Sequence, residues 1–159
     1  MPAPMTEFDV PTEDRYFEDY RPGVVYEFGS VTMDEARIVE FAREFDPQPI
    51  HVDPQAAALG IYGGIIASGF HTTAVMMRLF ADHYLSRVAS LGSPGVDELR
   101  WLLPVRPNDT LRLRCTILDA RRSASRPDRG VLHTRAEVIN QNDQTVLRLV
   151  VTNFLLVRP

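Results

Sequence analysis

The sequence contains no lysine, and all 17 of its basic residues are arginine. A mechanism that forms a Schiff base with a lysine amine is therefore excluded. Arginine offers instead a planar fork of donors that suits phosphates and carboxylates wherever several arginines cluster. Asp and Glu together number 21, which gives a net charge of −4. That acidic balance argues against a nucleic-acid partner, because nucleic-acid-binding proteins normally present a basic face.

Cysteine is almost as scarce, since Cys115 is the only one. A disulfide framework and a cysteine-based zinc site are both excluded. The four histidines lack the spacing of metal ligands, so we expect no metal. The glycine-rich fingerprint of dinucleotide-binding proteins and the G-x-S-x-G elbow of serine hydrolases are also missing. We therefore expect no cofactor.

The sequence also lacks a long hydrophobic run. Its most apolar stretch, residues 60–80, is interrupted by glycines, histidines and Arg78, which is not typical of a membrane span. Residues 1–20 are acidic and contain no apolar segment of the kind found in secretory signals. We expect a cytoplasmic protein that has no membrane partner.

What is present fits one globular domain. Hydrophobic residues make up 45% and charged residues 24% of the chain, which is ordinary for such proteins. A length of 159 residues is enough to bury a core without disulfides or metals. We expect a single domain over residues 1–159, of which residues 1–20 form an N-terminal arm.

The first half of the sequence predicts a strand and then a helix. Residues 24–31 have the composition of a strand. In the segment that follows, Thr32 and Glu35 form a capping-box pattern, and apolar residues recur at i, i+3, i+4 and i+7. Pro47 ends this helix.

Two further helices are expected before the middle of the chain. Residues 53–60 predict a short one, with Asp53 as its N-cap and Pro54 in its first turn. Residues 67–87, "ASGFHTTAVMMRLFADHYLSR", predict a long one. Its apolar residues are spread around most of the helix, so we expect it to be largely buried.

The second half changes to the period of β-strands. Strands are expected over 96–105, 110–117, 131–139 and 145–157, and the turn "NQND" joins the last two as an antiparallel hairpin. A long buried helix against an antiparallel sheet is an α+β arrangement, and a sheet that wraps such a helix is the hot-dog architecture. Because a sheet of this size leaves one flank uncovered, we expect a dimer with a continuous sheet.

The stretch "FDPQPIHVDPQ", residues 45–55, places an acid and an imidazole five residues apart, at Asp46 and His51. One interpretation is structural, with Asp46 in an Asx-type turn before Pro47 and His51 as a loop residue. The other is functional. Pro47 and Pro49 stiffen the loop, and a stiff loop that holds these two groups is what general acid–base chemistry requires.

A second stretch, "GGIIASGFHTT", is expected to open the long helix at Gly69. The first amides of a helix have no internal partner and favour negative charge, so the Gly69 amide is a candidate oxyanion donor. The alternative is that Ser68 is an N-cap and Gly69 makes a packing contact. His71, in the first turn, is more typical of a packing or capping residue.

Three blocks in this sequence resemble the MaoC-type dehydratases, the family of the (R)-specific enoyl-CoA hydratases. They are "FAREFDPQPIHVDPQAAA", "GGIIASGFHTTAVMMRL" and "DELRWLLPVRPNDTLR", and the resemblance runs from about residue 15 to the C-terminus. The D-x-x-P-x-H pattern of the family matches at Asp46, Pro49 and His51.

The resemblance implies a hot-dog fold, usually dimeric, with no metal or redox cofactor. It further implies that Asp46 and His51 form a catalytic dyad and that Gly69 binds the thioester carbonyl. Gln48 stands where many members have asparagine, and Ser68 stands where many have histidine. We expect these two residues to contact the substrate.

An acyl-CoA or carrier-bound substrate would carry phosphates to a chain that is acidic overall. The densest arginine cluster, "RRSASRPDRG" over 121–130, is the candidate phosphate site, with Arg122 and Arg126 as its main residues. The alternative is a solvated loop between strands.

The expected reaction is therefore the interconversion of a 2-enoyl thioester and an (R)-3-hydroxyacyl thioester by acid–base catalysis on one water. Two alternatives stay open. One is a hot-dog thioesterase, in which a carboxylate activates water against the thioester carbonyl. The other is a non-catalytic protein that binds acyl thioesters without turnover.

Overall fold

The structure, a computed structural model, describes residues 2–159. Two 3₁₀ turns, η1 (Thr12–Asp14) and η2 (Phe17–Asp19), precede the main elements. The helices are α1 (Glu35–Phe45), α2 (Pro49–Val52), α3 (Pro54–Leu59) and α4 (Gly69–His83). The strands are β1 (Val25–Thr32), β2 (Gly95–Trp101), β3 (Thr110–Arg122), β4 (Arg129–Ile139) and β5 (Thr145–Leu156). No helix among these residues is both long enough and apolar enough to cross a membrane.

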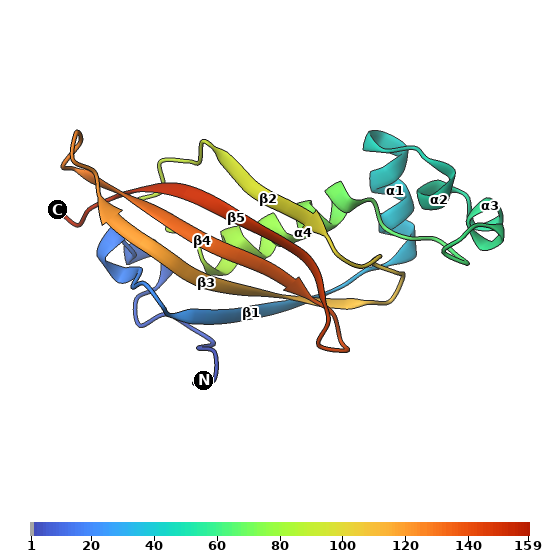
Figure 1. Ribbon diagram of the computed structural model, residues 1–159, viewed down its shortest axis with the longest axis horizontal. Helices are drawn as coiled ribbons and strands as arrows, with labels where there is room; N and C mark the ends of the chain where they lie inside the picture. Colours follow the sequence, from blue (N-terminus) through green and yellow to red (C-terminus); the bar gives the residue numbers. More distant parts are fainter. Residues whose placement is uncertain (1) are drawn as a thin grey trace.

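The five strands form one antiparallel sheet in the order β1-β3-β4-β5-β2, and α4 lies against one face of it (Figure 1). The alternation predicted for β3 is confirmed, because Leu111, Leu113, Cys115 and Ile117 are all buried on the side of the core. The sheet curves around α4, so the expected single-domain α+β hot-dog fold is confirmed.

Helix α4 packs tightly against β1 at Gly29. This glycine has a φ of +66°, and a side chain there would meet Leu79 and His83 of α4. The buried face of α4 carries Thr72, Met76, Leu79 and Phe80. The opposite face is open, with Phe70 61% and Met77 46% exposed. The expectation that α4 is buried around most of its circumference is therefore wrong for a single chain, because the sheet covers only one side of the helix.

The start of α1 differs from the prediction. Thr32 is the last residue of β1, and the N-cap is Asp34, whose Oδ1 accepts a hydrogen bond from the Ala36 amide at 3.0 Å. The capping box of Thr32 and Glu35 is therefore wrong. Thr32 and Asp34 are both possible N-caps. Because Thr32 pairs with Thr110 as part of β1, the helix begins after Asp34.

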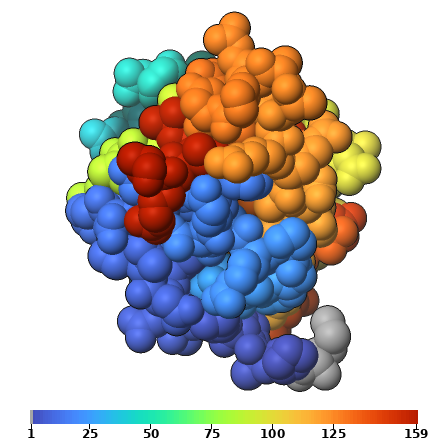
Figure 2. Space-filling model, turned by 90° about the vertical axis from the view of Figure 1, so that its left-hand side faces the viewer, coloured from blue at the N-terminus to red at the C-terminus, as the bar shows by residue number. Residues whose placement is uncertain are grey.

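The N-terminal arm is docked on the core rather than free. The Arg15 guanidinium is buried and donates to the carbonyls of His83 and Tyr84, both at 2.9 Å. The Tyr20 hydroxyl also donates to the Tyr84 carbonyl, at 2.6 Å. Figure 2 shows the N-terminal segment in blue, spread over the end of the molecule where the β3–β4 hairpin, in orange, also lies.

Candidate active site

Asp46 stands at the C-terminal end of α1. Its amide donates to the Ala42 carbonyl at 2.8 Å and completes the last helical turn. The helix dipole disfavours a carboxylate at this end. Two side-chain donors offset that cost: Gln48 Nε2 donates to Oδ1 and Ser68 Oγ donates to Oδ2, each at 2.7 Å. Both bonds come from other side chains, so the Asx-type turn offered by the structural interpretation of Asp46 is wrong.

These donors also set the protonation of Asp46. The hydrogen bond from Gln48 lowers the pKa of the carboxyl most, followed by that from Ser68, and the neighbouring His51 lowers it further. Partial burial acts in the opposite direction. The carboxylate is therefore ionised at neutral pH, with its two oxygens already engaged.

His51 lies on α2, a single helical turn that the sequence analysis did not predict and that begins at Pro49. The imidazole is only 5% exposed. Its Nδ1 lies 2.7 Å from the carbonyl oxygen of Ile66. Because a carbonyl can only accept, Nδ1 must carry the proton, and in the neutral ring Nε2 is left as a bare acceptor.

The bare Nε2 lies 3.3 Å from Asp46 Oδ2. An ionised carboxylate and an unprotonated nitrogen both accept and cannot bond directly. A shared proton donor satisfies both, either a proton on Nε2 or a water whose two O–H groups point to the two acceptors. The pair can therefore share one proton or accept hydrogen bonds from one water.

Ser68 and Gly69 join this pair to the start of α4. Ser68 is completely buried, and its Oγ accepts from the Phe70 amide at 3.3 Å while it donates to Asp46. The expectation that Ser68 contacts substrate is not supported by this placement, because no part of the side chain is exposed. Ser68 instead caps α4 and holds the carboxylate.

Gly69 is the first residue of α4, and within residues 2–159 its amide donates to no protein acceptor. Its Cα is covered by the indole of Trp101, so that a Cβ at this position would lie 2.4 Å from a ring atom. The interpretation of Ser68 as an N-cap and Gly69 as a packing contact is therefore confirmed, and the role of the Gly69 amide as an oxyanion donor stays a prediction. The glycine makes a packing contact, and its amide is left without a partner.

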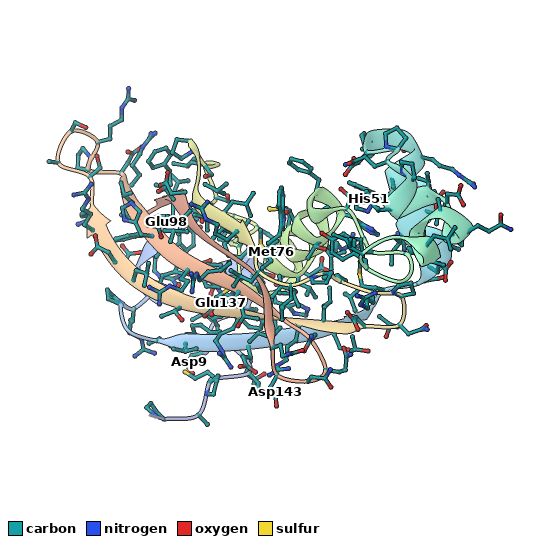
Figure 3. All side chains as sticks on the ribbon, turned by 45° about the vertical axis from the view of Figure 1, so that its right-hand side comes forward. Asp9, His51, Met76, Glu98, Glu137 and Asp143 are labelled. Carbon is teal, nitrogen blue, oxygen red and sulfur yellow. The ribbon has the colours of Figure 1, made fainter. Side chains whose placement is uncertain are left out.

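A cavity of about 450 Å³ lies between the α1–α3 segment, the start of α4 and the end of β2. Figure 3 shows His51 where the α1–α3 segment meets α4. Asp46, Gln48, His51 and Gly69 all line this cavity. The remaining wall is mostly apolar and includes Ile50, Ile66, Phe70, Trp101, Leu102, Leu103, Val105 and Val146. Such a pocket, with few polar groups on one wall, is typical of a site for a largely apolar small molecule.

The structure does not bring Arg122 and Arg126 to this cavity. Arg122 ends β3 and Arg126 lies in the β3–β4 hairpin, at the end of the sheet opposite the α1–α3 segment (Figure 1). Arg106 lies nearer, since its Nη1 donates at 2.6 Å to the carbonyl of Tyr62, which lines the cavity. The density of arginines along the chain does not reveal which end of the sheet they occupy.

The structure also shows where His71 lies and which residues of the cavity wall the sequence did not predict. His71 lies outside it and stacks on Phe41 of α1, with ring centroids 4.6 Å apart, as expected of a packing residue. Trp101 and Tyr62 line the cavity, and the sequence analysis did not select them. The available signal was the run "WLLP" at the end of β2, where exposed apolar residues precede a proline.

Comparison with known proteins identifies the family of this chain. Residues 19–141 match the model of the MaoC-like domain. The chain is 35% identical to the crystal structure of a MaoC-like dehydratase from Rhodospirillum rubrum, with a TM-score of 0.84 over 91% of this chain and 99% of that one. The uncharacterized protein YdeM of Bacillus subtilis is 30% identical over 81% of this chain and 90% of its own length.

A further relative is the 3-hydroxyacyl-thioester dehydratase Z of Mycobacterium tuberculosis, which is 29% identical over 69% of this chain and 72% of its own length. The match of the family model covers most of the chain and includes Asp46, His51 and Gly69. The chain belongs to the MaoC-like dehydratase family.

Proposed function

We propose that this chain is a hydro-lyase that interconverts a 2-enoyl thioester and an (R)-3-hydroxyacyl thioester. The observation that carries the proposal is the pairing of His51 Nε2 with Asp46 Oδ2 at 3.3 Å in the wall of an apolar cavity. Gly69, whose amide has no protein partner within residues 2–159, lines the same cavity. A relative whose name is 3-hydroxyacyl-thioester dehydratase supports the same reaction class.

In the hydration direction, the pair binds one water that lies against both Nε2 and Oδ2 and accepts one of its protons. The water oxygen then bonds to Cβ of the enoyl group, and the electrons of the double bond move toward the thioester carbonyl. The Gly69 amide donates to the oxygen on which this negative charge gathers. The pair returns the proton to Cα, so that one water is added and no other reactant is consumed.

Each of these groups contributes a measurable part of the rate. Removing a single oxyanion donor typically costs on the order of 10² to 10³ in kcat. A positioned acid or base typically contributes about 10² to 10⁴. Because Asp46 and His51 act on the same water, their effects are not additive, and each single variant loses nearly as much as the double variant.

The test is the turnover of Asp46→Asn and His51→Ala on a panel of enoyl-CoA thioesters, followed by the absorbance of the conjugated double bond. We expect a loss of about 10² to 10⁴ in kcat/KM for each variant. His133→Ala, a histidine on β4 outside the cavity, is the matched control and should retain full activity. Wild-type activity in either dyad variant would falsify the assignment.

The same panel separates the alternatives. Release of free thiol without loss of the double bond would identify a thioesterase. Saturable binding of the thioester without either change would identify a binding protein that does not turn its ligand over.

We also propose that the protein works as a homodimer or a dimer of dimers. Strand β2 is an edge strand whose outer edge is unpaired within residues 2–159, and nearly all of its residues are exposed. Phe70 and Met77 on α4 are also exposed, as are Val96 and Trp101 of β2 itself. A second copy paired along β2 would extend the sheet and cover these apolar side chains.

A further inference from the structure

A chain of hydrogen bonds connects the indole of Trp101 with the carboxylate of Asp46. Trp101 Nε1 donates to Thr73 Oγ1 at 3.1 Å, and Thr73 Oγ1 donates to the Gly69 carbonyl at 2.8 Å. The next amide, that of Phe70, donates to Ser68 Oγ at 3.3 Å, and Ser68 Oγ donates to Asp46 Oδ2 at 2.7 Å. The chain is continuous, because the Gly69 carbonyl and the Phe70 amide belong to one peptide group.

All donors in this chain point in the same direction. Each hydroxyl accepts one hydrogen bond and donates one, and the peptide group accepts at its oxygen and donates at its nitrogen. Donors arranged head to tail polarise one another, so each bond strengthens the next. The last donor faces an ionised carboxylate, where a hydrogen bond has its largest effect.

Trp101, where the chain of hydrogen bonds begins, is held in place by packing. The Trp101 indole lies directly on Gly69, where any side chain would meet the ring, and it packs edge-on against Phe70 with centroids 5.1 Å apart. On the sheet side, Trp101 pairs with Leu147 of β5. The indole thus fixes the start of α4 against the end of β2, and it is also part of the cavity wall.

We propose that Trp101 and Thr73 are positioning residues for the Asp46–His51 site. Trp101 sets the position of Gly69 by contact, and Thr73 orders the donors that end on Asp46. A group bound against the indole therefore acts on the carboxylate through this chain without touching it. The assignment deepens the proposed function, and only its kinetic consequence depends on that function.

The surroundings of Asp46 allow the effect to be isolated. His51 on α2 and Tyr62 are the other titratable side chains that line the cavity within residues 2–159. The charged residues Arg43 and Glu44 lie on α1 itself and are exposed. Neither Trp101 nor Thr73 is charged, so their replacement alters the hydrogen bonds without adding or removing a charge near the carboxylate.

The decisive variant is Thr73→Val, which keeps the shape of the side chain and removes the hydroxyl. Thr73→Ser, which keeps the hydroxyl, is its matched control. Trp101→Phe keeps an aromatic ring near Gly69 while it removes the Nε1 donor and one ring of the indole. The measurement is the titration of the Asp46 carboxyl carbon by NMR, with the thermal midpoint as a check that each variant is folded.

We expect the titration midpoint of Asp46 to rise by about 0.1 to 0.6 pH units in Thr73→Val and by less in Trp101→Phe. Thr73→Ser should titrate like the wild type. If Thr73→Val and Trp101→Phe, both folded, leave the midpoint unchanged, the positioning role is wrong. Should Thr73→Val fail to fold, the Trp101→Phe titration alone decides.

The readout keeps this inference distinct from the proposed reaction, because the carboxyl titrates whether or not the protein turns over a thioester. In an active enzyme, the acidic limb of the pH profile of kcat/KM should move with the NMR midpoint. The Asp46 midpoint could shift as expected in the variants while the wild type shows no hydratase activity. That result would support the positioning role of Trp101 and Thr73 and reject the proposed reaction.

Discussion

Gln48 is the residue on which the charge of Asp46 depends most, because its amide donates to Oδ1 and lowers the pKa of the carboxyl more than any other group. Replacing Gln48 with alanine should therefore raise the pKa of Asp46, because the carboxylate loses the donor that lowers its pKa most. The acidic limb of kcat/KM should shift to higher pH by the same amount. Gln48→Glu is the informative companion, since a second carboxylate should raise the pKa further. An unchanged profile in both variants would show that the bond does not hold in solution.

Individual residues show how much of the candidate site could be predicted from the sequence. The spacing of Asp46 and His51 predicted a pair, and the structure brings them together, with His51 on the helical turn α2 in place of the expected loop. The role of Ser68 was not predictable, because its burial depends on how α4 docks against the end of α1. Trp101 escaped selection for the same reason: its contact with Gly69 joins β2 to α4, and no local pattern records it.

Among the elements, the packing of α1 on α4 carries a pH dependence. Burial lowers the pKa of His71, and the neighbouring Arg37 lowers it further, so the folded protein favours the neutral ring. Arg78 and Asp34 line the same groove. The contribution of His71 to stability is therefore fully present above its unfolded pKa of 6.5 and is lost as the pH falls through the lower folded value.

We expect the wild type to lose more stability between pH 7.5 and pH 5 than His71→Phe, which preserves the stacking on Phe41 and cannot be protonated. Denaturant unfolding at the two pH values measures the difference. Equal losses in the two proteins would assign the pH dependence to other groups.

The elements themselves differed in how well local pattern predicted them. The strands of the second half followed their alternation, since each has one face on the core. Helix α2 was missed because four residues are too few to show a helical period. The exposed face of α4 was assigned to the core because apolar residues surround the helix on all sides, and composition does not tell a core from an interface.

For the whole molecule, the open face of α4 and the free edge of β2 lead to a test of assembly. Met77→Arg places a charge among exposed apolar side chains and should convert the homodimer into a monomer, as measured by light scattering after gel filtration. Leu118→Arg alters an apolar residue of similar exposure on β3, away from α4, and should leave the dimer intact. A wild type that is already monomeric would contradict the proposed assembly.

The position of Arg122 and Arg126 is also a matter of the whole molecule. Sequence density made them the candidate phosphate site, and the fold carries them to the far end of the sheet from His51. Their role in binding the phosphates of a thioester stays a prediction. Within one chain, neither arginine lines the cavity. Global placement of this kind depends on strand order, which the local sequence does not encode.

The only thiol of the chain, Cys115, is fully enclosed by the sheet and α4, and burial raises its pKa well above the usual range. A native molecule therefore offers maleimide dyes no site to react with. A cysteine introduced at Arg126 would accept a fluorophore alone, without prior removal of the natural one. Cys115 itself would react only in molecules whose β-sheet has opened. The rate at which a thiol reagent modifies Cys115 therefore measures the unfolding of the protein.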